Sequence, residues 1–335
     1  MNQKQIEKKR CNEIDIMKGI GILLIILGHL EPETYLMRFI YSFHLFLFFA
    51  VSGFVGERYR NRSFKEIVCQ NIRRLLIPYF IWNSISNLIE MSGGDINWHQ
   101  FCMNIMYMNG SVGWNAALWF LVSLFWTDTV CAIVIRVKMV FQVCYMVLML
   151  GLWICLASSK IMLPYGLYTV PIASFFWLMG YRINIDGVYE KIVNRRNRIN
   201  IWSACFGGYL LVVFGVFYNT VISIYHVNYS NYIFTIIAGI AGVYSLFCIS
   251  IIIEKNFVSL ARLLKFYGEN TLIILCTHYL ILRSFGAVTQ KYAGVNYWRL
   301  TSTSKSIIMT FVMGLIYYSI IAIKKTICNR IKICQ

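Results

Sequence analysis

The chain has 335 residues, of which 59% are hydrophobic and only 13% are charged, and its mean hydropathy is +0.62. This composition excludes an ordinary soluble domain and indicates a protein that crosses a membrane several times. The net charge of +17 does not indicate a nucleic-acid-binding protein, because the basic residues lie in short clusters between apolar segments rather than on one soluble face.

Ten apolar segments of membrane-spanning length follow one another along the chain. We expect transmembrane helices at residues 14–31, 35–56, 72–91, 116–135, 139–158, 161–181, 201–222, 231–253, 268–285 and 306–323. The first segment lacks a small-residue cleavage site, so we expect it to remain in the mature protein. The sequence therefore predicts an all-α bundle of about ten spans, in one membrane domain that covers residues 1–335.

Most of the 31 Lys and Arg residues fall in segments that share a side of the membrane with the N-terminus. By the positive-inside rule, both termini are predicted to be cytoplasmic, with tails at 1–13 and 324–335. The outer loop at 92–115 is long and polar, and we expect it to cap an external opening.

The first span carries Asp15, Lys18 and His29. At about 100° per residue, the three side chains fall within roughly 60° of one another on a helix. An ionisable group facing lipid costs on the order of 2.5–3.5 kcal/mol, so this stripe is predicted to face a polar interior. The alternative is an interfacial Asp15 and Lys18, with His29 simply hydrogen-bonded near the other end.

Two more histidines, His44 and His278, fall at a similar depth to His29, between the middle and the outer third of the membrane. Histidine is the most common general base near neutral pH, which makes these three residues candidates for proton transfer. For His44 and His278, a packing role with a hydrogen-bonded ring is the alternative.

The third span begins with Arg73 and Arg74 at the predicted cytoplasmic face. Paired arginines commonly mark topology, but guanidinium groups also bind phosphate oxygens through two parallel hydrogen bonds. The pair is therefore a candidate site for a phosphate-rich ligand.

Asn83, Asn87 and Glu90 recur at i, i+4 and i+7 of the same span and form a second polar stripe, which we expect to line the same interior. Asp128 in the fourth span is a further intramembrane carboxylate without an evident partner in the sequence. The 11 cysteines include no C-x-x-C and no Cys/His cluster at zinc spacing, so we expect no metal site and no disulfide framework.

Motifs of one family follow each other in order along most of the chain. They are Asp15-x-x-Lys18-Gly19, Gly28-His29, Phe43-His44-x-x-x-Phe48-Phe49-x-x-Ser52-Gly53-Phe54, Arg74-x-x-x-Pro78-Tyr79, Leu118-Trp119-Phe120-Leu121, and Gly268-x-x-Thr271-Leu272 followed by His278. This set resembles the acyltransferase-3 family of integral membrane acyltransferases. The lysine at position 18, where arginine is the alternative, resembles the residue in the branch of fucose or oligosaccharide O-acetyltransferases. The family often has R-x-x-R at the third span, where this chain has Asn71 in the first position.

The resemblance implies transfer of an acyl group, usually acetyl from cytoplasmic acetyl-CoA, to a hydroxyl of a surface polysaccharide or lipid-linked oligosaccharide. It also implies a location in the cytoplasmic (inner) membrane of a bacterium. The implied roles of the residues are a catalytic group of His29, Asp15, Lys18, His44 and His278, with His29 as the base; CoA binding by Arg73, Arg74 and Lys18; and acceptor binding by Asn83, Glu90 and Trp119.

Other functions compete with this interpretation. Transfer of another acyl group such as succinyl is the nearest alternative, and both direct transfer and a covalent acyl-enzyme are compatible with the residues. A glycolipid transporter or flippase also needs polar stripes in the membrane, but the inverted repeats of many transporters are not evident in this sequence. A non-catalytic scaffold has no reason to keep these ionisable residues in the membrane.

Overall fold

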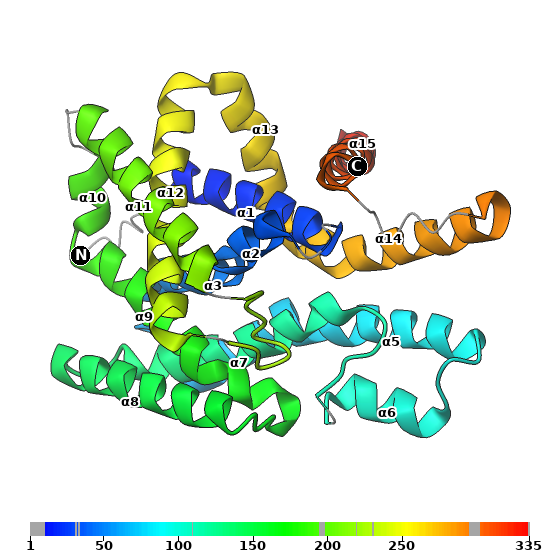
Figure 1. Ribbon diagram of the computed structural model, residues 1–335, viewed down its shortest axis with the longest axis horizontal. Helices are drawn as coiled ribbons and strands as arrows, with labels where there is room; N and C mark the ends of the chain where they lie inside the picture. Colours follow the sequence, from blue (N-terminus) through cyan, green and yellow to red (C-terminus); the bar gives the residue numbers. More distant parts are fainter. Residues whose placement is uncertain are drawn as a thin grey trace.

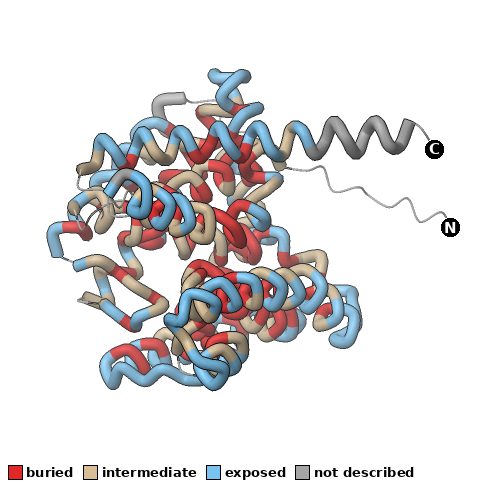
Figure 2. The backbone as a smooth tube through the Cα atoms, turned by 90° about the vertical axis from the view of Figure 1, so that its right-hand side faces the viewer, coloured by how far each residue is buried: buried red, intermediate tan, exposed pale blue. Residues whose placement is uncertain are grey.

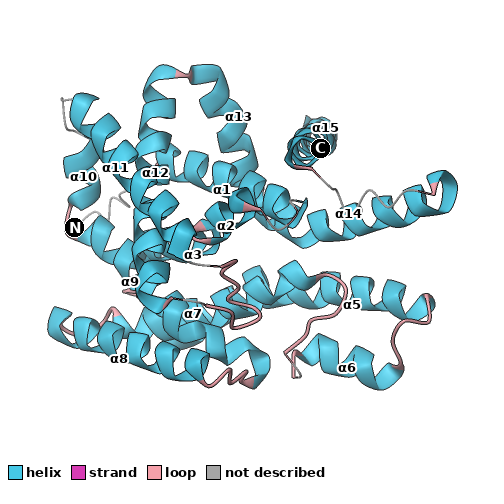
Figure 3. Ribbon diagram, in the orientation of Figure 1, coloured by secondary structure: helices cyan, strands magenta, loops and turns pink. Residues whose placement is uncertain are grey.

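The computed structural model describes residues 11–30, 32, 34–108, 110–193, 198–218, 220–229, 231–294 and 302–333. Within these ranges the regular structure is helical, without a strand, and the only β-pairing is an isolated bridge between Ser223 and Asn228 (Figure 3). The predicted all-α fold is confirmed.

The longer helices form the body of the molecule. They are α1 (Asn12–Leu30), α2 (Tyr35–Tyr41), α3 (His44–Phe54), α5 (Ile77–Ser92), α7 (Trp119–Val134), α8 (Met139–Ser158), α9 (Val170–Ile185), α11 (Arg198–Tyr218), α12 (Tyr232–Asn256), α14 (Thr271–Ala293) and α15 (Thr303–Ile333). Shorter elements connect them. These are η1 (Gly56–Tyr59), α4 (Phe64–Asn71), the π-helical turn η2 (Ile72–Leu76), α6 (Trp98–Met106), η3 (Ala116–Leu118), η4 (Pro164–Thr169), α10 (Val188–Val193) and α13 (Val258–Glu269).

Among the described residues, seven helical segments are long and apolar enough to cross a membrane. They are Tyr35–Phe54, Ala116–Val134, Met139–Ser158, Ile201–Tyr218, Tyr232–Asn256, Thr271–Tyr292 and Thr303–Ile323. The other three predicted spans coincide with α1, α5 and α9, which are 19, 16 and 16 residues long. The protein is thus a multi-pass integral membrane protein, and the count of ten spans stays a prediction.

Large apolar side chains are exposed on the outer helices, as a bilayer requires. Figure 2 shows buried residues concentrated in the centre and exposed ones on the outer faces. On α8, for example, Val140 and Leu148 are 69% and 68% exposed, and on α15 Phe311 is 67% exposed. Apolar surface of this extent indicates contact with lipid.

Two helices extend past the predicted spans. Helix α14 continues to Ala293, past the predicted end of its span at 285, and α15 stays helical to Ile333, through most of the predicted tail at 324–335. In Figure 1, α15 is seen end-on while α14 lies across the page, so the two helices cross rather than run parallel. Residues 1–10 of the predicted N-terminal tail lie outside the described residues.

The predicted loops also contain helices, because their sequences carry start signals that a hydropathy reading overlooks. In the predicted outer loop at 92–115, Asn97 and Gln100 form a capping box that begins α6. In the predicted cytoplasmic loop after α3, Ser63 and Glu66 form the same arrangement at the start of α4.

Two pairs of glycines bring helix backbones into direct contact. A side chain at Gly19 of α1 would overlap the carbonyl oxygen of Leu264 in α13, and one at Gly268 would overlap the carbonyl oxygen of Asp15. The contact is thus reciprocal, and α1 lies directly beside α13 (Figure 1). Small residues allow this close approach in membrane helices. This crossing fixes the position of the polar end of α1.

A second reciprocal contact joins α3 to α9. A side chain at Gly53 would overlap the carbonyl oxygen of Trp177, and one at Gly180 would overlap the carbonyl oxygen of Ala50. The motif glycines Gly19, Gly53 and Gly268 therefore have a packing role that the sequence analysis did not identify.

Candidate active site

A cavity of about 770 Å³ lies between α1, α3, η1, η2, α7 and α14. Its size is that of a pocket for a cofactor or a large small-molecule ligand. The wall is largely apolar, with charged side chains from Asp15, Lys18, Glu57, Arg58 and Arg74. These residues place it toward the predicted cytoplasmic face.

Asp15 and Lys18 form an ion pair in this wall, with 2.6 Å between Nζ and the carboxylate oxygen. The side chain of Asp15 is only 5% exposed, and that of Lys18 is 24% exposed. The polar stripe of the first span therefore does face the interior at this end. Both residues lie far from His29, since the rise between Lys18 and His29 is about 16 Å.

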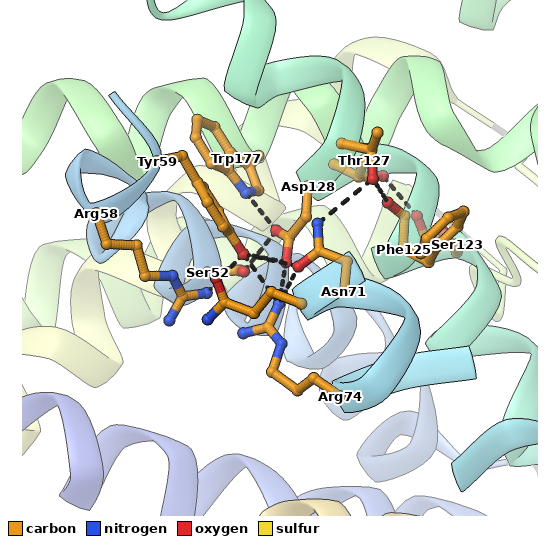
Figure 4. Close-up of polar contacts among 12 residues, drawn as sticks. Ser52, Arg58, Tyr59, Asn71, Arg74, Ser123, Phe125, Thr127, Asp128 and Trp177 are labelled. Carbon is orange, nitrogen blue, oxygen red and sulfur yellow. Dashed lines mark hydrogen bonds and ion pairs between the residues drawn. The ribbon is translucent and has the colours of Figure 1, made fainter. Parts of the chain in front are cut away.

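Asp128 is the centre of a buried polar cluster (Figure 4). Its Oδ1 accepts hydrogen bonds from Ser52 Oγ and from Trp177 Nε1, each at 2.7 Å. Its Oδ2 accepts a hydrogen bond from Tyr59 at 3.2 Å and forms an ion pair with Arg74. The carboxylate that had no evident partner in the sequence is therefore fully engaged, and it holds Arg74 in the cavity wall.

Tyr59 connects this cluster to a second arginine. Its hydroxyl accepts hydrogen bonds from Arg58 at 2.9 Å and from Arg74 at 3.2 Å, and lies 3.1 Å from the side-chain oxygen of Asn71. Burial raises the pKa of Tyr59, so the hydroxyl remains protonated near neutral pH. Asn71, at the position where the family often has arginine, thus accepts hydrogen bonds rather than binding anions.

The two neighbouring arginines of the third span point to different environments. Arg74 lines the cavity, whereas Arg73 is exposed and lies outside the cavity lining. The π-helical turn η2 contains both residues. The structure therefore offers Arg74, and not Arg73, to a ligand in the cavity.

The three candidate histidines come together at the other end of α1. The rings of His29 and His278 stack with 5.4 Å between centroids, and the ring of Tyr279 meets His29 edge-on at 5.2 Å. Tyr41 joins His44 to the group, because its ring lies 4.8 Å from that of His44 and its hydroxyl 3.4 Å from Nδ1 of His29. We call His29, His44 and His278 the histidine cluster.

Hydrogen bonds fix the neutral form of two of these rings. Nδ1 of His44 lies 2.8 Å from the carbonyl oxygen of Ile40, and Nδ1 of His278 lies 2.9 Å from that of Ile274. Because a carbonyl only accepts, Nδ1 carries the proton in each ring and Nε2 of the neutral ring is unprotonated. Nε2 of His278 is buried and has no hydrogen-bond partner among the described residues.

The cavity ends just short of the histidine cluster. The residues that line it on α1 extend to Ile25, and those on α14 extend to Leu275. His29 and His278 follow these positions by about one helical turn. The cavity and the cluster are therefore adjacent regions along the same two helices.

The second polar stripe has a different role from the predicted one. Asn83 donates to the backbone carbonyl of Asn104 at 3.2 Å, and Asn87 donates to Asn83 Oδ1 at 2.8 Å and to the carbonyl of Val112 at 3.2 Å. Glu90 accepts a hydrogen bond from the backbone of Trp114 at 2.9 Å. Instead of lining the cavity, these side chains fasten the segment 92–115 to α5, because its backbone carbonyl and amide groups need partners.

Trp119 is also outside the cavity lining. It is 6% exposed and stacks on Tyr225 with 5.9 Å between ring centroids. The hydroxyl of Tyr225 accepts from the backbone amide of Val112 at 3.3 Å. Trp119 thus supports the contact between the segment 92–115 and the loop that contains Tyr225.

Sequence reasoning missed Arg58, Tyr59 and the partners of Asp128. The sequence did indicate that Asp128 has partners, because a carboxylate within a span requires a cation or several hydrogen-bond donors. Arg58 belongs to a cluster of basic residues that the positive-inside rule was enough to explain. Among the described residues, no three His, Cys, Asp or Glu side chains are grouped so that they could hold a metal ion.

A multi-pass helical protein with a charged cavity at one side and buried histidines beyond it fits a class of enzymes that bind a ligand on one side and react on the other. The acyltransferase-3 family, described as an acyltransferase domain, matches residues 12–323. The chain belongs to this family and is a membrane acyltransferase. No curated protein and no solved structure matches the chain.

Proposed function

We propose that the protein is an O-acetyltransferase, which takes acetyl from cytoplasmic acetyl-CoA and transfers it to a hydroxyl of a surface polysaccharide or a lipid-linked oligosaccharide in a bacterial inner membrane. One observation carries the proposal: the charged cavity ends about one helical turn before the histidine cluster. A long donor seated in the cavity can therefore present its acyl group to a base.

His29 is the base in this proposal. It takes the proton of the sugar hydroxyl while the oxygen attacks the thioester carbonyl, and the resulting tetrahedral intermediate expels the CoA thiolate, which receives that proton from His29. His278 and Tyr279 hold the ring of His29 by contact from two sides. His44 supports the same group through Tyr41.

Asp15 and Lys18 act on the donor rather than on His29, because they lie in the cavity wall. Asn83, Glu90 and Trp119 contribute to acceptor binding indirectly, by holding the outer segment 92–115 and the loop around Tyr225 in place. Transfer of another acyl group, such as succinyl, needs no change in these roles.

The test is acetyl transfer by the purified protein in nanodiscs, with acetyl-CoA labelled on the acetyl group and a polysaccharide fraction from an expression host as acceptor. His29→Ala should lower the rate by about 10²–10⁴-fold, since a positioned base contributes that much. His99→Ala is the matched control, because His99 is exposed on α6, and it should retain full activity.

A fully active His29→Ala protein would remove His29 as the base. Label that stays on the wild-type protein without acceptor would indicate an acyl-enzyme and move His29 to the role of nucleophile. A wild type that neither binds nor consumes acetyl-CoA would contradict the acetyl donor and favour another acyl group.

A further inference from the structure

The cations of the cavity wall differ in how their charges are compensated. Lys18 is paired with Asp15 and Arg74 with Asp128. Glu57 accepts from Tyr181 at 2.9 Å and pairs with Arg60 at 3.6 Å. Each of these charges already has an opposite charge within the protein.

Arg58 is different. Among the described residues no carboxylate lies within salt-bridge distance of its guanidinium group, although the residue lines the cavity. Within the described part of the chain its guanidinium group interacts with Tyr59, through a hydrogen bond of 2.9 Å to the hydroxyl and with the guanidinium carbon 4.7 Å from the ring centre. Its Nε is buried and has no hydrogen-bond partner in the described ranges. A partly buried cation in this state attracts an anion.

Arg58 and Arg74 also lie next to each other. Both donate to the same hydroxyl of Tyr59, and the Nε of Arg74 likewise has no partner among the described residues. Figure 4 shows the two side chains converging on Tyr59 from η1 and η2. Two adjacent guanidinium groups with free donors match the oxygens of a phosphate group.

We propose that Arg58 is the principal phosphate ligand of this cavity, with Arg74 as its neighbour in an anion site anchored by Tyr59. The proposal rests on the proposed function, because it assigns the phosphate to the nucleotide end of a CoA donor. Arg58 thereby provides a guanidinium group where Asn71 occupies the position at which the family often has one.

A phosphate at the cytoplasmic face can also belong to an anionic lipid headgroup. The experiment therefore uses nanodiscs of phosphatidylcholine alone and nanodiscs that contain phosphatidylglycerol. CoA binding is measured by titration calorimetry for the wild type, Arg58→Gln and Arg73→Gln. Arg73 is the matched control, because it is a neighbouring exposed arginine outside the cavity lining.

Arg58→Gln should weaken CoA binding by about 10–100-fold, since charge-assisted hydrogen bonds contribute strongly. Arg73→Gln should bind like the wild type, and both variants should keep the wild-type thermal unfolding temperature. With acetyl-pantetheine, which has no phosphate, Arg58→Gln should turn over as fast as the wild type. This last result separates a phosphate ligand from a residue that only shapes the cavity.

Wild-type protein that does not bind CoA would contradict the proposed function itself. Wild-type protein that binds CoA, together with an Arg58→Gln variant of the same affinity, would overturn only the role of Arg58. If Arg58→Gln leaves CoA affinity unchanged but abolishes a difference between the two lipid compositions in thermal unfolding, the anion is a lipid headgroup and the CoA assignment is wrong.

Discussion

The two ends of α1 keep polar groups in the membrane by different means. At the cavity end, full charges are present: Lys18 is balanced by Asp15 and Arg74 by Asp128, whereas Arg58 has no carboxylate within salt-bridge distance among the described residues. At the other end, the buried polar groups are neutral rings and amides that bond to backbone carbonyls, as in His44 and His278.

Under the proposed function, this difference corresponds to the role of each end: the cavity end binds the anionic donor, and the other end holds the base. A cation that is held in place and already partly desolvated, such as Arg58, can bind an incoming anion at moderate cost. Under the proposed function the base, His29, needs an unprotonated nitrogen, and the hydrogen bonds of His44 and His278 through Nδ1 keep its neighbours neutral. The comparison predicts that substitutions at the two ends will have distinct effects.

The largest effect on stability is expected at the charged end. Asp128→Ala removes the partner of Arg74 and leaves the donors of Ser52 and Trp177 unpaired. We expect the free energy of unfolding to fall by about 2–4 kcal/mol, less than the maximum for a buried pair because Arg74 is 31% exposed. Thermal unfolding in detergent measures this.

Asp186→Ala is the control for that experiment. Asp186 pairs with Arg182 at 2.5 Å, but its side chain is 39% exposed, so its removal should cost less than about 1 kcal/mol. Equal losses in the two variants would show that the cluster around Asp128 adds no more to stability than an exposed ion pair does.

At the histidine cluster we expect an effect on rate without a loss of stability. His278→Phe removes Nε2, which is buried and has no partner among the described residues, together with the Nδ1 hydrogen bond to the Ile274 carbonyl, and it retains an aromatic ring against His29. The turnover number should fall by about 10–100-fold, because the ring that stacks on His29 loses both of its nitrogen atoms. The unfolding temperature should stay constant or rise.

The measurement for His278→Phe is steady-state transfer, with kcat and KM determined separately. KM for the donor should not change, since His278 lies outside the cavity lining. His226→Phe, at an exposed loop position, is the control. Unchanged kcat in His278→Phe would leave this residue a packing role.

The smallest effect is expected from the amide stripe. Asn87→Ala removes hydrogen bonds to Asn83 and to the carbonyl of Val112, and should lower stability by about 1–3 kcal/mol. Hydrogen exchange should become faster in the segment 92–115 and not at the cavity. Leu88→Ala, an exposed neighbour on the same helix, should leave this exchange rate unchanged.

Much of the fold was predictable, because hydropathy and helix period depend on local sequence. The depth of His29, His44 and His278 follows from the rise per residue, and the structure brings the three together. The pairing of Asp15 with Lys18 likewise follows from their spacing of three residues.

What could not be predicted depends on how helices pack. Arg74 and Asp128 are 54 residues apart, and no local pattern indicates that η2 faces α7. Asn83 and Asn87 do share a face of α5, but the sequence does not show that α6, rather than the cavity, covers that face. Arg58 resembles every other basic residue of its loop until its lack of an acidic partner is seen.

The glycine contacts between α1 and α13 set the distance between the two polar ends of α1. Because Gly19 lies against the backbone of Leu264 and Gly268 against that of Asp15, the polar end of the helix is fixed, and the rise of about 16 Å from Lys18 to His29 is a set length. A donor that docks its anionic end in the cavity must span this length to deliver its acyl group. Under the proposed function, we expect a short donor such as acetyl phosphate, held at the charged end of the cavity, to end before the base, so that reach as well as charge would select the donor.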